Sequence, residues 1–129
     1  MKSLLGLVIV AVLVFGAVPA SAGEPTQVWR CEMEDGVSEE DVEAMAAAWL
    51  KAAKTVPGGA NFKASVFFPV AVNLVDDTDV WFVVTAPSFA EWGKFWDNYG
   101  DSAAGDIEDQ HKEKIVCPDS ALWESIKVQ

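Results

Sequence analysis

The single histidine of the chain is the first residue whose setting could support metal or cofactor chemistry. His111 stands three residues after Glu108, and Glu-x-x-His is one half of a carboxylate-bridged di-iron motif. The other half requires a second histidine, which the sequence does not contain. Binding of a haem iron is the functional interpretation that remains. The structural alternative, which we favour, is a solvated histidine on a helix rich in Asp, Glu and Lys.

Three aspartates that lie close together, Asp76, Asp77 and Asp79, could suggest a calcium site. The loop lacks the D-x-D-x-D-G spacing and the bidentate glutamate that follows it in calcium loops. We therefore interpret this segment as a charged turn and predict no metal site. The sequence also has no Walker loop, Rossmann glycine fingerprint, GxSxG elbow or HExxH motif, so it assigns no catalytic residue and no cofactor.

Length and charge restrict the class of protein further. The chain has 129 residues, of which 51% are hydrophobic, and this predicts one folded domain. The chain carries 20 acidic and 9 basic side chains, for a net charge of −11. Such a negative balance argues against nucleic acids and anionic membranes as partners.

The first 22 residues have the features of a secretory signal peptide. Lys2 provides a positive charge, an apolar run follows from Leu4 to Val18, and Ala20-Ser21-Ala22 forms an A-x-A cleavage site. The apolar run is shorter than the ~20 residues that a membrane span requires. We expect residues 1–22 to be a signal peptide and residues 23–129 to be a single α+β domain. The mature protein would be periplasmic or secreted, without a membrane anchor.

The two cysteines, Cys31 and Cys117, lie near opposite ends of the expected mature chain. An isolated pair in an exported protein predicts a disulfide bond. A redox-active thiol pair is the alternative, but the C-x-x-C spacing that lowers a thiol pKa is absent.

The elements that must position these residues can be read from hydrophobic periodicity and capping signals. Ser38 with Asp41, and Ser88 with Glu91, fit the signature of a helix N-terminus. We expect strands over 27–33, 61–75 (bent or interrupted at Pro69), 79–85 and 121–128, and helices over 38–56, 88–100 and 102–114.

This order is β-α-β-β-α-β with one extra helical piece, and it predicts a ferredoxin-like α+β fold. Two helices would cover one face of a four-stranded antiparallel sheet. In the third strand, Val80, Phe82 and Val84 alternate with Trp81 and Val83, so both faces are apolar. Because the chain has no element left to cover the second face, we expect a homodimer.

The element order, the strongly capped first helix, the aromatic second helix and the closing segment LWESIKV resemble the dimeric α+β barrel superfamily. This superfamily includes antibiotic-biosynthesis monooxygenases and NIPSNAP-like proteins. The resemblance covers residues 27–128 and implies two sheets packed face to face, with a pocket in each protomer. It also implies a cofactor-free monooxygenase or a haem-using enzyme as one possible activity, although the signal peptide and cysteine pair differ from the usual cytoplasmic members.

Side chains that alternate away from the helices define a candidate ligand site on the sheet. They combine aromatic walls with a few polar and cationic groups, as small-molecule sites do. The candidate ligand-binding residues are Arg30, Lys63, Phe67, Trp81, Thr85 and Trp123. Trp49, Trp92 and Trp96, on helices, are interpreted as core.

Three functional hypotheses follow from these patterns. The first is a non-catalytic exported dimer that binds a small, partly aromatic ligand between the sheet and the dimer mate. The second is the monooxygenase or haem-using enzyme implied by the resemblance. The third is a structural or protein-interaction module whose sheet face is only an interface.

Overall fold

The computed structural model describes residues 23–71 and 79–129. The expected signal peptide (1–22) and the expected turn at 76–78 lie outside the described residues. Seven elements follow in the order β1 (Glu24–Met33), α1 (Glu39–Ala53), β2 (Lys63–Phe67), β3 (Val80–Thr85), α2 (Phe89–Asp97), α3 (Ala103–His111) and β4 (Ile115–Ser125). In this part of the chain, no helix is both long enough and apolar enough to cross a membrane.

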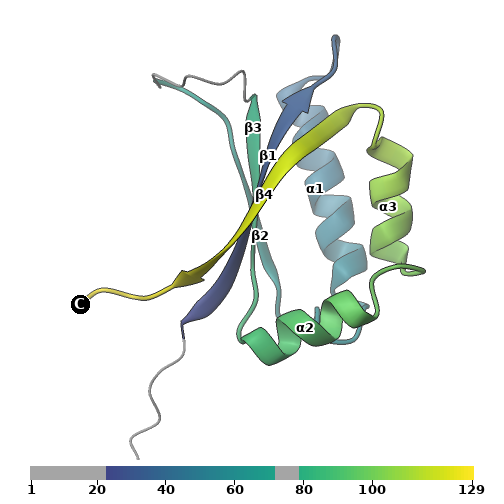
Figure 1. Ribbon diagram of the computed structural model, residues 1–129. Coiled ribbons are helices and arrows are strands. Elements are labelled where there is room, and N and C mark those ends of the chain that lie inside the picture. The colour runs from purple at the N-terminus through teal and green to yellow at the C-terminus, as the bar shows by residue number, and fades with distance from the viewer. Residues whose placement is uncertain (1–22, 72–78) are drawn as a thin grey trace, which may run out of the picture.

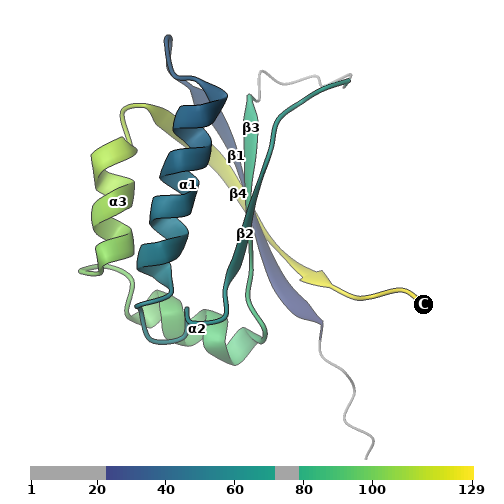
Figure 2. The same ribbon diagram turned by 180° about the vertical axis from the view of Figure 1, so that it is seen from behind.

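The four strands form one antiparallel sheet in the order β2-β3-β1-β4. All three helices lie on the same side of this sheet, and the other side carries no element in either view (Figures 1 and 2). The predicted ferredoxin-like α+β architecture, with helices on one face, is therefore confirmed. The open face of the sheet is the face that carries no helix.

Local sequence explains where α1 begins. The Ser38 hydroxyl accepts a hydrogen bond from the Asp41 backbone N–H (3.1 Å), and the Asp41 carboxylate accepts one from the Ser38 N–H (2.9 Å). This is a capping box, with Asp41 in the place of the usual glutamate. The hydrogen bonds from the Ser38 backbone and hydroxyl lower the pKa of Asp41. The helix ends at Ala53, a few residues before the expected end at Val56.

Serine caps also begin the other two helices. Ser88 accepts a hydrogen bond from the backbone N–H of Glu91 (3.2 Å), and Ser102 accepts one from that of Gly105 (3.2 Å). The connection between α2 and α3 contains Tyr99. It allows α3 to pack beside α1, as both views show (Figures 1 and 2). The expected third helical piece is therefore a true helix, shorter at both ends than predicted.

The prediction for the last strand was wrong in its bounds. We expected residues 121–128, but β4 starts at Ile115 and includes Pro118. The pairing of β4 with β1 shifts between Arg30 and Glu32 of β1, which is a bulge opposite Cys31. A proline fits there because β4 is an edge strand and the bulge leaves its position outside the hydrogen-bonded ladder.

The core between sheet and helices consists of two clusters. The larger one holds Phe62, Phe95 and Val84, all at most 1% exposed, with the interpreted core residue Trp49. Trp92 and Trp96 are half-buried and pack against it. The smaller cluster consists of Cys31, Val42 and Val80. Strand alternation places Val80 and Val84 toward the helices and Trp81 on the open face, as predicted.

Candidate functional site

A cavity of about 520 Å³ lies between the sheet and the helices, where side chains of both core clusters form its walls. This volume falls in the range of small-molecule sites. Its lining is mainly apolar and aromatic, with three ionisable side chains from one end of α3. The residues that line it include Trp29, Cys31, Ala46, Trp49, Phe82, Trp96, Tyr99, Glu108, His111, Lys112 and Cys117.

Five aromatic rings from different elements line this cavity. Trp29 of β1 stacks on Phe82 of β3 with ring centroids 5.6 Å apart, and its centroid is 6.2 Å from that of Trp96. Trp49 of α1 meets Phe82 edge-on at 5.3 Å, with an interplanar angle of 90°. Trp96 lies 4.5 Å from Tyr99 between centroids, at 53°. Because the ring planes differ so widely in direction, the rings form walls of the cavity rather than one flat stack.

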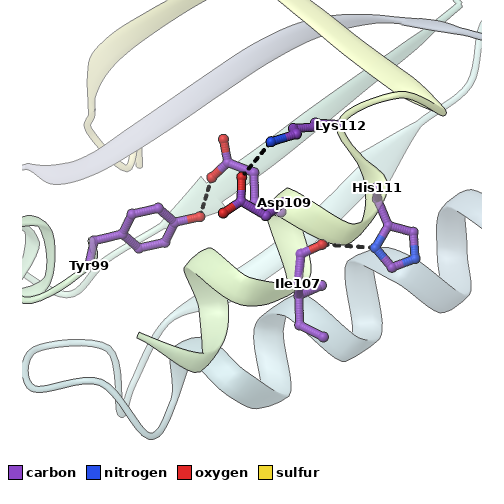
Figure 3. A network of polar contacts seen from close by, with 6 residues as sticks. Tyr99, Ile107, Asp109, His111 and Lys112 are labelled. Carbon is purple, nitrogen blue, oxygen red and sulfur yellow. Dashed lines mark hydrogen bonds and ion pairs between the residues drawn. The ribbon is translucent and has the colours of Figure 1, made fainter. Parts of the chain in front are cut away.

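Three residues that line the cavity, Trp49, Tyr99 and Glu108, are linked by a chain of two hydrogen bonds, which we call the relay. The indole N–H of Trp49 donates to the Tyr99 hydroxyl (3.1 Å), which in turn donates to the carboxylate of Glu108. Figure 3 shows the Tyr99 hydroxyl directed at a carboxylate group next to Asp109. Burial, together with the hydrogen bond to Glu108, raises the pKa of Tyr99 well above its ordinary range. Tyr99 therefore stays a neutral hydrogen-bond donor under physiological conditions.

His111 lies at the α3 end of the cavity and is half-buried. Its Nδ1 lies 2.8 Å from the carbonyl oxygen of Ile107, so Nδ1 carries the proton and donates (Figure 3). The side chain is only partly solvated: besides facing the charged surface of α3, it lines the cavity. Lys112 beside it pairs with Asp109 at 3.2 Å. Among residues 23–71 and 79–129, no group of three His, Cys, Asp or Glu side chains could hold a metal ion.

Trp96 contributes a second polar feature. Its indole nitrogen is buried and has no hydrogen-bond partner within the described part of the chain. A buried donor without a partner is unfavourable by about 1–3 kcal/mol. Trp96 is also one of the residues that line the cavity.

The predicted disulfide is confirmed. Cys31 and Cys117 are bonded across β1 and β4, 86 positions apart in the sequence, and both line the cavity. Cys31 is 1% exposed. The bond holds the bulged start of β4 against β1 and so fixes one wall of the cavity.

The six ligand-binding residues predicted from the sequence lie on the open face instead, where the register brings them into rows. Phe67, Trp81 and Arg30 are consecutive cross-strand neighbours on β2, β3 and β1. A second row runs from Lys63 through Thr85 and Thr26 to Trp123. Arg30 also forms an ion pair with Asp119 of β4 (2.7 Å). The sequence therefore placed these residues on one face correctly, but none of the six lines the cavity. Their role in ligand binding stays a prediction.

Sequence reasoning missed the cavity because it treated the helical layer as a filled core. One signal was present: α1 carries the run Ala44-Met45-Ala46-Ala47-Ala48 before Trp49. Ala46 lines the cavity, and its methyl group leaves space that a larger side chain would fill. This run of small residues on a helix that faces an aromatic strand is the sequence pattern that could have indicated a cavity.

Comparisons with known proteins give structural matches only. No family model matches the chain, and no curated protein matches its sequence. The crystal structure of At3g17210 from Arabidopsis thaliana is similar, with a TM-score of 0.61 and 14% identity, over 82% of this chain and 98% of that one. A dimeric ferredoxin-like protein of unknown function from Thermobifida fusca is similar with a TM-score of 0.51 and 12% identity, over 81% of this chain and 92% of that one. At such identities the likeness concerns the fold, and by fold this chain is a ferredoxin-like α+β protein.

Proposed function

We propose that this chain is an exported protein that binds a small, partly aromatic molecule in the cavity between its sheet and its helices. The cavity carries the proposal: about 520 Å³ of space is walled by aromatic rings and has polar groups at one end. Apolar walls with a few fixed polar groups are the usual composition of ligand sites. The neutral Tyr99 hydroxyl, held by Trp49 and Glu108, is part of a wall that is already organised before binding.

We further propose that the open face joins two copies of the chain into a homodimer. Apolar side chains run diagonally across this face from Phe67 and Trp81 to Val83, Val28 and Trp123. Phe67, Trp81 and Trp123 are 55%, 39% and 62% exposed in the single chain. A contiguous exposed patch of such large aromatic groups is unusual on the surface of a monomeric protein. A two-fold axis near Val28 and Val83 would superpose the stripe on itself, as a homodimer interface requires. The Thermobifida fusca protein, which is described as dimeric, supports this assembly.

The ligand proposal is tested by filling the cavity. Ala46→Phe introduces a ring into the cavity, whereas Ala47→Phe places the same ring at a neighbouring, exposed position of α1 that does not line it. Calorimetric titration with naphthol, as a neutral aromatic probe, should show binding to the wild type and to Ala47→Phe. Binding to Ala46→Phe should fall at least about tenfold, since the added ring occupies the site.

Two results would contradict the proposal. One is a wild-type protein that does not bind naphthol and carries no ligand-sized extra mass in native mass spectrometry. The other is naphthol binding that both phenylalanine variants retain equally, which would place the probe outside the cavity.

A further inference from the structure

We infer that the cavity selects organic cations, such as a quaternary ammonium group, over uncharged molecules of the same shape. This inference rests on the proposed function, because it concerns the ligand class of the same cavity. It follows from two independent features: the number and arrangement of aromatic rings in the wall, and the charge at the α3 end.

The rings of Trp29, Trp49, Trp96 and Tyr99 all line the cavity, and they come from β1, α1, α2 and the α2–α3 connection. A cation is attracted to the face of an aromatic ring within about 6 Å of its centroid, and tryptophan is the strongest such partner. The interplanar angle is 53° both between Trp29 and Trp96 and between Trp96 and Tyr99, so neighbouring rings turn toward different directions. A cation in this space could approach several rings at once. Aromatic cages bind quaternary ammonium groups in this way.

The charge of the cavity favours the same class of ligand. Glu108 lines it, and within the described residues its carboxylate accepts a hydrogen bond from Tyr99 but pairs with no cationic side chain. Lys112, which also lines it, is paired with Asp109 outside the lining. The net charge of the chain is −11, so the surrounding field is negative as well. With Lys112 paired to Asp109, the exposed carboxylate of Glu108 leaves one net negative charge at this end of the cavity, and this charge favours a cation over an uncharged molecule.

The test compares choline with its carbon isostere, in which a quaternary carbon replaces the quaternary nitrogen. Both fill the same volume, so a difference in affinity reports the charge. Calorimetric titration of the wild-type protein should show choline binding at least about tenfold more tightly than the isostere, as expected where a cation meets more than one aromatic ring.

Glu108→Gln removes the charge while its amide oxygen still accepts the hydrogen bond from Tyr99. We expect the ratio of the two affinities to fall toward one in this variant, because the charge that distinguishes the two compounds is removed. Glu113→Gln is the matched control, because Glu113 is exposed, follows α3 closely and does not line the cavity. Thermal unfolding of both variants checks that each remains folded.

Equal affinity for the two compounds, or tighter binding of the isostere, would overturn the inference and leave the proposed function intact. A preference for choline that survives in Glu108→Gln and disappears in Glu113→Gln would also overturn it. Binding of naphthol but of neither small compound would overturn the cation preference alone. Failure of all three probes would remove the proposed function as well.

Discussion

The hydroxyl group of Tyr99 donates a hydrogen bond to the carboxylate of Glu108, and this contact joins the α2–α3 connection to the middle of α3. The same hydroxyl accepts from Trp49 on α1, so one phenol links three segments of the helical layer. Its partners lie nine and fifty residues away in the sequence. This side chain therefore connects three segments that line the cavity.

Tyr99 is the only tyrosine of the chain, so its ionisation can be followed directly by tyrosinate absorbance. Because burial and Glu108 raise its pKa, we expect no ionisation in the folded protein near pH ~10, where an unperturbed tyrosine titrates. The folded state then holds this proton more tightly than the unfolded state. The stabilisation is fully present below about pH 10 and is lost as the pH rises toward the folded-state pKa.

The control is the same titration in concentrated denaturant, where the pKa should return to about 10. Glu108→Gln should move the folded-state pKa partly back toward this value, because burial remains and the negative charge is gone. A native protein that ionises like the denatured chain would contradict the burial of Tyr99 and its hydrogen bond to Glu108.

Removal of the Cys31–Cys117 bond should lower the free energy of unfolding by about 2–5 kcal/mol. The bond closes a long loop and holds β4, whose side chains are otherwise mostly exposed, against β1. Urea denaturation of the double variant Cys31→Ala/Cys117→Ala, compared with the oxidised wild type, measures the difference. Two free thiols in protein taken from an exported fraction would show that the bond does not form.

Trp81→Glu should dissociate the proposed dimer, because an unpaired carboxylate would be buried where the two sheets meet. Sedimentation at micromolar concentration should show a dimer for the wild type and a monomer for this variant. Phe89→Glu is the matched control: Phe89 is similarly exposed (44%, against 39% for Trp81) but belongs to α2, away from the open face. A wild type that sediments as a monomer would contradict the interface.

Two glycines with positive φ should respond differently to substitution by alanine. Gly36 (φ +87°) has no atom within 4 Å of an added Cβ. The free energy of unfolding of its alanine variant should therefore fall only by the ~1–2 kcal/mol that a left-handed backbone costs a residue with a Cβ. At Gly58 (φ +94°) the Cβ would lie 2.4 Å from the carbonyl oxygen of Glu91 in α2. Because of this clash, we expect Gly58→Ala to lower the free energy of unfolding by about 1–3 kcal/mol more than Gly36→Ala does.

Denaturant unfolding of both variants gives this comparison directly. Gly93→Ala supplies the opposite control, since Gly93 lies within α2 with open space around it. Alanine there should raise the free energy of unfolding by up to about 1 kcal/mol through helix propensity. Equal losses for Gly36→Ala and Gly58→Ala would show that α2 does not pack closely on this turn.

Local features of the chain were decided by the sequence itself. The start of α1 could be predicted because Ser38 and Asp41 satisfy each other's hydrogen bonds within four residues, whatever the rest of the protein does. The face of each strand was also predictable, since alternation alone puts Val80 and Trp81 on opposite sides. The element order, together with these faces, was sufficient for the ferredoxin-like architecture.

Tertiary structure decided the bounds of β4 and the location of the cavity. Pro118 argues against a strand in the sequence, and only the position of β4 at the edge of the sheet, with a bulge opposite Cys31, makes that strand possible. The cavity depends on the distance between layers that are packed by residues far apart in the chain, such as Trp29, Trp49 and Tyr99. Periodicity reveals which side of an element is buried, but the space left between two buried sides is set by how all the side chains fill it.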